Sequence, residues 1–145
     1  MQKKYPKVKY ANIGDLSIAY QVWGDADKVL VYVPGMVSHL EVTLEILGYV
    51  DWLERLSKNF KVIIFDKRGQ GMSDRETSMP GIEARSDDIN AVVKAEGVKR
   101  FSLFGLSEGA AISLFYAASY PESVDAVATL GGFPRVSNSK DYALL

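Results

Sequence analysis

The stretch FSLFGLSEGA, residues 101–110, constrains the fold of this chain more than any other. A short apolar run ends at Gly105, Ser107 stands between two glycines, and an alanine-rich helical pattern begins at Ala110. Gly-x-Ser-x-Gly between a strand and a helix is typical of a sharp, strained turn, in which glycines let strand and helix approach each other. The sequence therefore predicts an exposed Ser107 hydroxyl at a helix N-terminus, where an oxyanion would be stabilised.

Alternating strand and helix patterns predict an α/β fold with a mostly parallel, doubly wound sheet of about six strands. The first two strand patterns are joined by Gly14 and Asp15, which favour a tight hairpin, so the sheet should open with an antiparallel pair. The later strand patterns are continuous apolar runs, including the last, and should be buried. The predicted strands are 7–13, 16–23, 29–33, 61–65, 101–104 and 124–130, and the predicted helices are 49–59, 82–96 and 110–120.

Composition excludes several classes of protein. The 145 residues suffice for a single globular domain, which we expect to span residues 1–145. The 17 basic and 18 acidic residues nearly cancel, so charge favours binding neither to nucleic acid nor to an anionic membrane. The chain has no cysteine, no apolar run of membrane-spanning length and no signal-peptide core at its N-terminus. We therefore expect a soluble, cytoplasmic protein.

Two further motifs occur together with the predicted turn. Pro34-Gly35 ends the third predicted strand and is followed by Ser38-His39-Leu40-Glu41, and the polar loop 66–74 reads DKRGQGMSD. With Gly14-Asp15, residues 18–21 and the Gly-x-Ser-x-Gly turn, these motifs make residues 10–134 resemble the α/β-hydrolase superfamily. More narrowly, the chain is similar to bacterial hydrolase-like domains that are often joined to adenylate-cyclase or transcription-regulator modules. The resemblance implies a truncated α/β-hydrolase fold that lacks the C-terminal part.

The resemblance also implies roles for individual residues. Ser107 would be the nucleophile, and the backbone amides of Met36 and Glu108 would form the oxyanion hole. The superfamily's acid and histidine follow the sixth strand, so a triad in that order is not expected in this chain. Its one histidine, His39, precedes the serine. His39 is either a histidine at a loop or helix start, bonded to Glu41 or to backbone, or the catalytic base, since the loop bearing Met36 must pass close to Ser107.

Charged residues near these motifs have structural interpretations beside functional ones. The Glu108 side chain should point away from Ser107, so that only its amide contributes. Asp66, Arg68 and Asp74 fit an ion-pair loop better than a phosphate or metal site, because no phosphate-binding glycine signature is present and aspartates without histidine rarely hold a metal. Asp88, near a helix start, is interpreted as a surface charge. We therefore predict neither a cofactor nor a metal.

Two functions are consistent with these residues. The first, which we favour because the serine turn and the oxyanion loop are both intact, is a promiscuous serine esterase acting on small short-chain carboxylic esters, with His39 or another copy supplying the base. The second is a non-catalytic binding or regulatory module built on a degenerate hydrolase half-fold. The apolar strand 124–130 would leave an unpaired edge, which predicts a homodimer or dimer of dimers joined through this strand, the helix after Ser107 or the tail 133–145.

Overall fold

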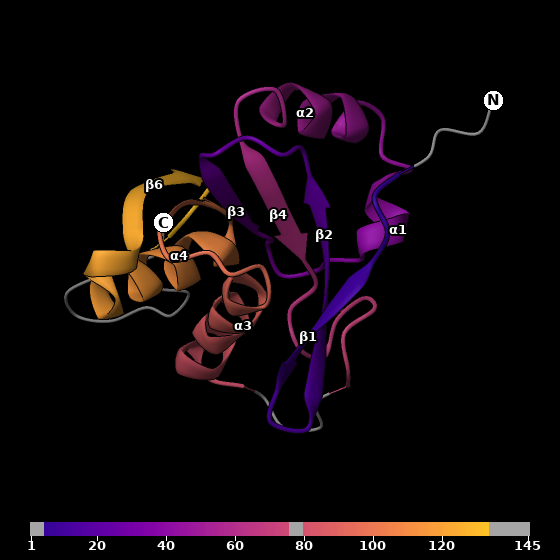
Figure 1. Ribbon diagram of the computed structural model, residues 1–145. Coiled ribbons are helices and arrows are strands. Elements are labelled where there is room, and N and C mark those ends of the chain that lie inside the picture. Colours follow the sequence, from indigo (N-terminus) through magenta and orange to yellow (C-terminus); the bar gives the residue numbers. More distant parts are fainter. Residues whose placement is uncertain (1–4, 76–79, 134–145) are drawn as a thin grey trace.

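The computed structural model describes residues 5–75 and 80–133, which form a six-stranded sheet flanked by helices (Figure 1). The strands are β1 (Lys9–Ile13), β2 (Leu16–Trp23), β3 (Val29–Val33), β4 (Lys61–Phe65), β5 (Phe101–Leu106) and β6 (Val124–Leu130). The helices are α1 (Leu40–Thr43), α2 (Tyr49–Leu56), α3 (Ile82–Ala95) and α4 (Glu108–Ser119), with a short 3₁₀ helix at Pro121–Ser123.

The strand order β1-β2-β4-β3-β5-β6 confirms the predicted sheet. β1 pairs antiparallel with β2, and β2 pairs antiparallel with β4, whereas β4, β3, β5 and β6 run parallel. The hairpin turns at Gly14, whose φ of 57° suits a residue without a side chain. β2, β3, β4 and β6 have the predicted bounds. α4 begins two residues earlier than predicted, because the turn at Ser107 is completed within one residue.

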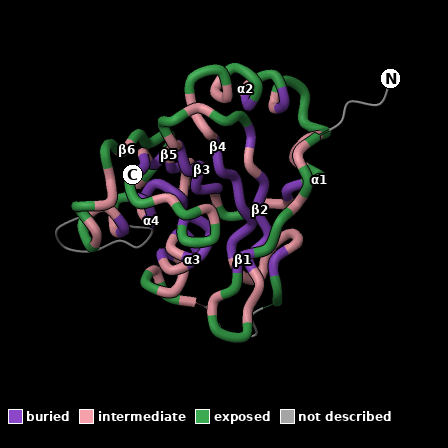
Figure 2. Tube along the Cα trace, viewed as in Figure 1, coloured by how far each residue is buried: buried purple, intermediate pink, exposed green. Residues whose placement is uncertain are grey.

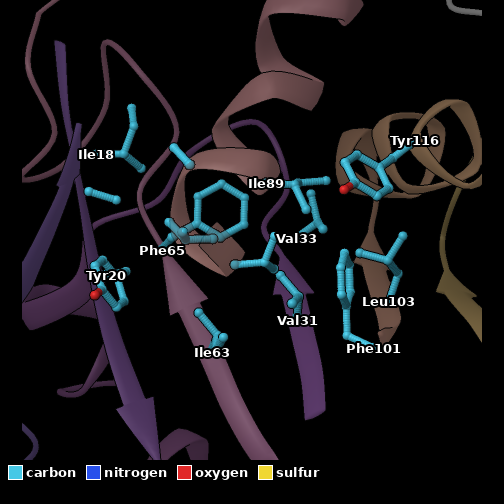
Figure 3. Close-up of a cluster of buried hydrophobic side chains, with 14 of the residues drawn as sticks. Ile18, Tyr20, Val31, Val33, Ile63, Phe65, Ile89, Phe101, Leu103 and Tyr116 are labelled. Carbon is cyan, nitrogen blue, oxygen red and sulfur yellow. The ribbon is translucent and has the colours of Figure 1, made fainter. Parts of the chain in front are cut away.

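Helices cover the sheet on both faces. α3 and α4 pack on one face and α1 and α2 on the other, as two separate clusters of buried apolar side chains. Because side chains alternate along a strand, β3 serves both clusters: Val31 and Val33 face α3 and α4, while Tyr32 faces α2. Figure 3 shows Ile89 and Tyr116 of the helices directed at β3 and β5 in the first cluster. Burying each large apolar side chain fully stabilises the fold by roughly 1.5–3 kcal/mol relative to leaving it exposed.

β6 is an edge strand, and the prediction that it is buried is wrong. None of its seven residues is buried (Figure 2). Leu130, its last residue, is 60% exposed. α4 packs on one face of β6, and the other face lines an apolar groove of about 360 Å³ together with α2. The groove residues are Leu30, Trp52, Leu56, Phe60, Ser102, Leu103, Phe104, Ala126, Val127 and Ala128. An apolar run shows that a strand can be buried, but only its neighbours decide whether it is.

Within the described ranges, no helix is both long and apolar enough to cross a bilayer. The tail that we expected at an interface begins at Phe133, and its remaining residues lie outside the described part of the chain.

Candidate active site

Ser107 occupies the strained turn that the sequence predicts. It lies between the end of β5 and the start of α4, with φ 53° and ψ −118°. In the described ranges it is the one non-glycine residue with positive φ, a conformation that costs on the order of 1–3 kcal/mol. Its N–H donates to the carbonyl oxygen of Leu130 in β6 at 2.8 Å. The edge strand thus holds the turn in place.

The two glycines of the turn are required by close backbone contacts. A Cβ atom on Gly105 would lie 2.5 Å from the carbonyl oxygen of Gly109 and 2.6 Å from Cα of Ala110. A Cβ on Gly109 would lie 2.1 Å from the carbonyl oxygen of Val33. These distances are far below van der Waals contact, so strand β5, helix α4 and the end of β3 can meet only where side chains are absent.

Residues 34–36, which follow β3 and are here called the oxyanion loop, lie against this turn. A Cβ on Gly35 would be 3.4 Å from Cβ of Ser107. Met36 is 71% exposed, and its backbone carbonyl oxygen accepts a hydrogen bond from Nε2 of Gln70. Glu108 is the first residue of α4, and the first-turn amides of a helix have no acceptor within the helix. The loop that carries Met36 and the N-terminus of α4 therefore meet at Ser107.

The Glu108 side chain takes part in a charged network. The sequence-based prediction considered only the Glu108 amide and did not include this network. Oε2 of Glu108 lies 2.5 Å from Nζ of Lys67, and its Oε1 pairs with Arg85. The Lys67 side chain is only 2% exposed, and its Nζ also donates to the carbonyl oxygen of Gly35 at 2.5 Å. Lys67 thus links the oxyanion loop to the first residue of α4.

The protonation of this network follows from its burial and its charges. Burial lowers the pKa of Lys67, although the hydrogen bond and charge of Glu108 act in the opposite direction. Burial acts to raise the pKa of the Glu108 carboxyl, but its contacts with Lys67 and Arg85 outweigh burial and lower that pKa. Glu108 is therefore ionised at neutral pH. The Glu108 carboxylate thus lies beside the turn, paired with two basic side chains, Lys67 and Arg85.

His39 is the N-cap of α1. Its Nδ1 accepts a hydrogen bond from the Val42 N–H at 3.4 Å, and its carbonyl oxygen accepts one from Oγ1 of Thr43 at 2.6 Å. The interpretation of His39 as a helix-start histidine bonded to backbone is confirmed. Because Nδ1 is the acceptor, a neutral ring carries its proton on Nε2. In the described part of the chain, the imidazole is bonded to α1 and not to Ser107.

A small cavity of about 40 Å³ lies beside His39 and is also lined by Tyr49 and Asp66. Oδ2 of Asp66 accepts hydrogen bonds from the amides of Leu40 at 3.1 Å and Met72 at 2.9 Å. Oδ1 of Asp66 is buried and has no hydrogen-bond partner among the described residues. A cavity of this size holds about one water molecule that such an atom could bind.

The loop 66–74 is held by its own charged residues, as the sequence predicts. The backbone N–H of Ser17 donates to Asp74 at 2.8 Å. Arg68 donates from Nε and from its backbone N–H to Asp88, at 2.9 Å and 3.0 Å. Asp88 is fully buried, so its interpretation as a surface charge is wrong. The preference of carboxylates for a helix N-terminus concerns their position along the chain. It does not show which face of α3 packs against the loop. The described residues contain no cluster of His, Cys, Asp and Glu suited to a metal ion.

Comparison with known proteins shows the family of the chain. The sequence model of the alpha/beta hydrolase fold matches residues 28–144. The chain belongs to this family. The human serine hydrolase BPHL is 30% identical over 116 residues, which cover 77% of this chain and 38% of BPHL.

Solved α/β-hydrolases share the fold. A carboxylesterase structure from the thaumarchaeon Nitrososphaera gargenis has a TM-score of 0.75 at 23% identity, covering 92% of this chain and 48% of the other. The enol-lactonase from Burkholderia xenovorans LB400 has a TM-score of 0.72 at 23% identity, covering 82% and 45%. The α/β-hydrolase described here thus spans less than half the length of these three proteins. The narrower resemblance to regulator-linked bacterial domains stays a prediction.

Lys67 is the site residue that sequence reasoning missed. Its signal was its position, two residues after the end of the buried strand β4, at the carboxyl ends of the parallel strands, where ligands bind in α/β folds. Because Lys67 stands between Asp66 and Arg68, the sequence fits a lysine of a surface ion-pair loop equally well.

Proposed function

We propose that this α/β-hydrolase is a serine esterase acting on small, short-chain carboxylic esters, with Ser107 as nucleophile. The observation that carries the proposal is the strained backbone of Ser107 at the N-terminus of α4, with the oxyanion loop packed against it. Strain of this kind persists only where the surrounding structure holds it, and it collects at functional sites. Similar proteins named as a serine hydrolase, a carboxylesterase and an enol-lactonase support the same class of reaction.

In the proposed reaction, Oγ of Ser107 attacks the carbonyl carbon of the ester while a base takes its proton. The carbonyl oxygen becomes an oxyanion, which the amides of Met36 and Glu108 would hydrogen-bond. The bond to the alcohol oxygen then breaks, and the alcohol leaves with the proton. Water attacks the acyl-enzyme in the same way, which releases the carboxylic acid and restores Ser107.

We propose His39 as the base, because it is the one histidine in the sequence. To accept the Ser107 proton at Nδ1, the imidazole must first leave the Val42 amide. A base with this constraint is weak, so we expect slow turnover that favours activated esters, whose leaving groups need no general acid. A second copy of the chain supplying the base is the alternative.

The capping role of His39 favours a second candidate function, a non-catalytic binding or regulatory module. Turnover of p-nitrophenyl acetate by the wild type and by Ser107→Ala separates the two functions. The esterase proposal predicts a rate that falls to background in Ser107→Ala. Equal rates in two folded proteins would favour the binding module.

We also propose that two copies associate through β6 as a homodimer, or as a dimer of dimers. The support is the exposed edge of β6 and the apolar groove beside it, which includes Ala126 and Ala128. Unpaired edge strands favour pairing with another chain, and a two-fold axis makes one edge complementary to itself. The cytoplasmic location and the single domain over residues 1–145 stay predictions from the sequence.

A further inference from the structure

We propose that Lys67 is a positioning residue for the oxyanion hole: by holding the Gly35 carbonyl, it directs the Met36 amide towards the reacting oxygen at Ser107. The inference rests on the proposed esterase function. It starts from one contact, the 2.5 Å hydrogen bond from Nζ of Lys67 to the carbonyl oxygen of Gly35. No part of the Gly-x-Ser-x-Gly signature predicts this contact.

Because a peptide unit is planar, a contact that holds the Gly35 carbonyl also sets the direction of the Met36 N–H. The carbonyl of Gly35 and the N–H of Met36 belong to the same planar peptide unit, which is trans, so they point in opposite directions. A cation that holds the carbonyl on one side therefore directs the N–H to the other side. Since Gly35 lies against Ser107, that orientation is set beside the nucleophile.

A second hydrogen bond holds the next carbonyl of the same loop. Nε2 of Gln70 donates to the carbonyl oxygen of Met36, and Oγ of Ser38 donates to Oε1 of Gln70 at 3.3 Å. The carbonyls before and after the Met36 amide are therefore both held by side chains of the loop 66–74. This leaves the Met36 peptide little freedom to rotate.

Lys67 is itself held rigidly enough for this role. Its side chain is almost fully buried and lies 2.5 Å from Oε2 of Glu108, whose other oxygen pairs with Arg85. One ammonium thus joins Gly35 and Glu108, the two residues that set the two amides of the proposed oxyanion hole. Buried charges require partners, and the Lys67 ammonium satisfies its donors on the Glu108 carboxylate and on the Gly35 carbonyl together.

The experiment measures the second-order rate constant for phosphonylation of Ser107 by a fluorophosphonate, whose phosphoryl oxygen occupies the oxyanion hole. Melting temperatures identify the folded variants. Lys67→Met removes the donor, and Lys67→Arg keeps a charged donor. Lys67→Met combined with Glu108→Gln removes the donor without leaving a lone carboxylate. Lys58→Met, at an exposed lysine, is the matched control.

We expect Lys67→Met to react about 10 to 100 times more slowly than wild type, less than the roughly 10²- to 10³-fold effect of losing an oxyanion donor outright. Lys67→Arg should recover most of the rate, and Lys58→Met should match wild type. The double variant should stay as slow as Lys67→Met. A purely structural ion pair predicts instead that the double variant regains the wild-type rate, because no charge is left unpaired.

A folded Lys67→Met or double variant that reacts at the wild-type rate would overturn the inference alone. If neither variant folds, Lys67→Gln provides an uncharged donor of shorter reach. It should react more slowly than wild type, and a wild-type rate there overturns the inference as well. A folded wild type that is not labelled at Ser107 would overturn the proposed function and the inference together.

Discussion

A Cβ atom on Gly109 would lie only 2.1 Å from the carbonyl oxygen of Val33, so the start of α4 rests directly on the last residue of β3. Val33 is followed at once by the oxyanion loop. The contact therefore couples two parts of the candidate site, the turn at Ser107 and the loop that bears Met36. Any side chain at residue 109 would push them apart.

Gly109→Ala should therefore be strongly destabilising. The added methyl group meets backbone atoms that no side-chain rotation can move, so we expect the free energy of unfolding to fall by about 3 kcal/mol. Denaturant titration measures this loss. Gly81→Ala is the control, because Gly81 has φ −65° and its Cβ would meet only the flexible Glu83 carboxylate. A Gly109→Ala protein as stable as the control would contradict the packing described.

His39→Asn separates the two roles of His39. Asparagine is a good N-cap, so the melting temperature should change little, whereas it cannot act as a general base. If His39 is the base, p-nitrophenyl acetate turnover should fall by about 10²-fold or more. His39→Ala, which also loses the cap, should lower the free energy of unfolding by about 1 kcal/mol. Undiminished turnover in a folded His39→Asn protein removes His39 as the base.

Glu96 should make stability depend on pH. Burial acts to raise the pKa of this carboxyl, but hydrogen bonds outweigh it and lower the pKa from 4.5 to about 2. The donors are Lys9, Lys61 and Tyr20. Since the folded state binds the proton less readily than the unfolded state, the stabilisation is present above about pH 4.5 and is lost as pH falls towards 2.

Comparison of Glu96→Gln with wild type at two pH values checks this sign. At pH 7 the substitution should cost about 1 kcal/mol of unfolding free energy, and at pH 2.5 the two proteins should differ much less. Glu122→Gln, at an exposed residue, is the control and should match wild type at both pH values. A cost that stays constant or grows on acidification would show that the contacts of Glu96 do not stabilise the fold.

Association through β6 predicts a species of about 32 kDa, twice the 16.0 kDa of one chain, by light scattering after size exclusion at micromolar concentration. A dimer of dimers would double this mass again. Ala128→Lys adds a charge on the exposed strand and should yield monomers. Tyr10→Lys, at an exposed residue of β1 on the opposite edge of the sheet, should leave the assembly intact. A stable, folded wild type of about 16 kDa would reject the assembly.

The sequence predicted the fold well where local chemistry decides the structure. The runs 29–33 and 61–65 became strands with the predicted bounds, because continuous β-branched and apolar residues suit a sheet covered on both faces. The turn at Ser107 was predictable because closely packed backbones leave glycine as the residue that fits at 105 and 109. Helix α1 was not predicted, since four residues are too few to show a helical period.

The remaining features depend on contacts between distant residues. The burial of Asp88 depends on Arg68, 20 positions away, and Lys67 meets Glu108 across 41 positions. No spacing rule connects such pairs. The exposure of β6 likewise depends on what covers it and not on its own residues. The Ser107 backbone was therefore predictable from sequence, whereas the network that holds the oxyanion loop was not.

Covalent labelling shows whether Ser107 is a nucleophile. The folded wild type is treated with a fluorophosphonate, and the modified peptide is located by mass spectrometry, with Ser107→Ala treated in parallel. We expect one adduct, on Ser107, which is absent from Ser107→Ala because an alanine offers no hydroxyl to the phosphorus. A wild-type protein that is folded by circular dichroism and yet carries no adduct on Ser107 would contradict the claim that Ser107 is a nucleophile.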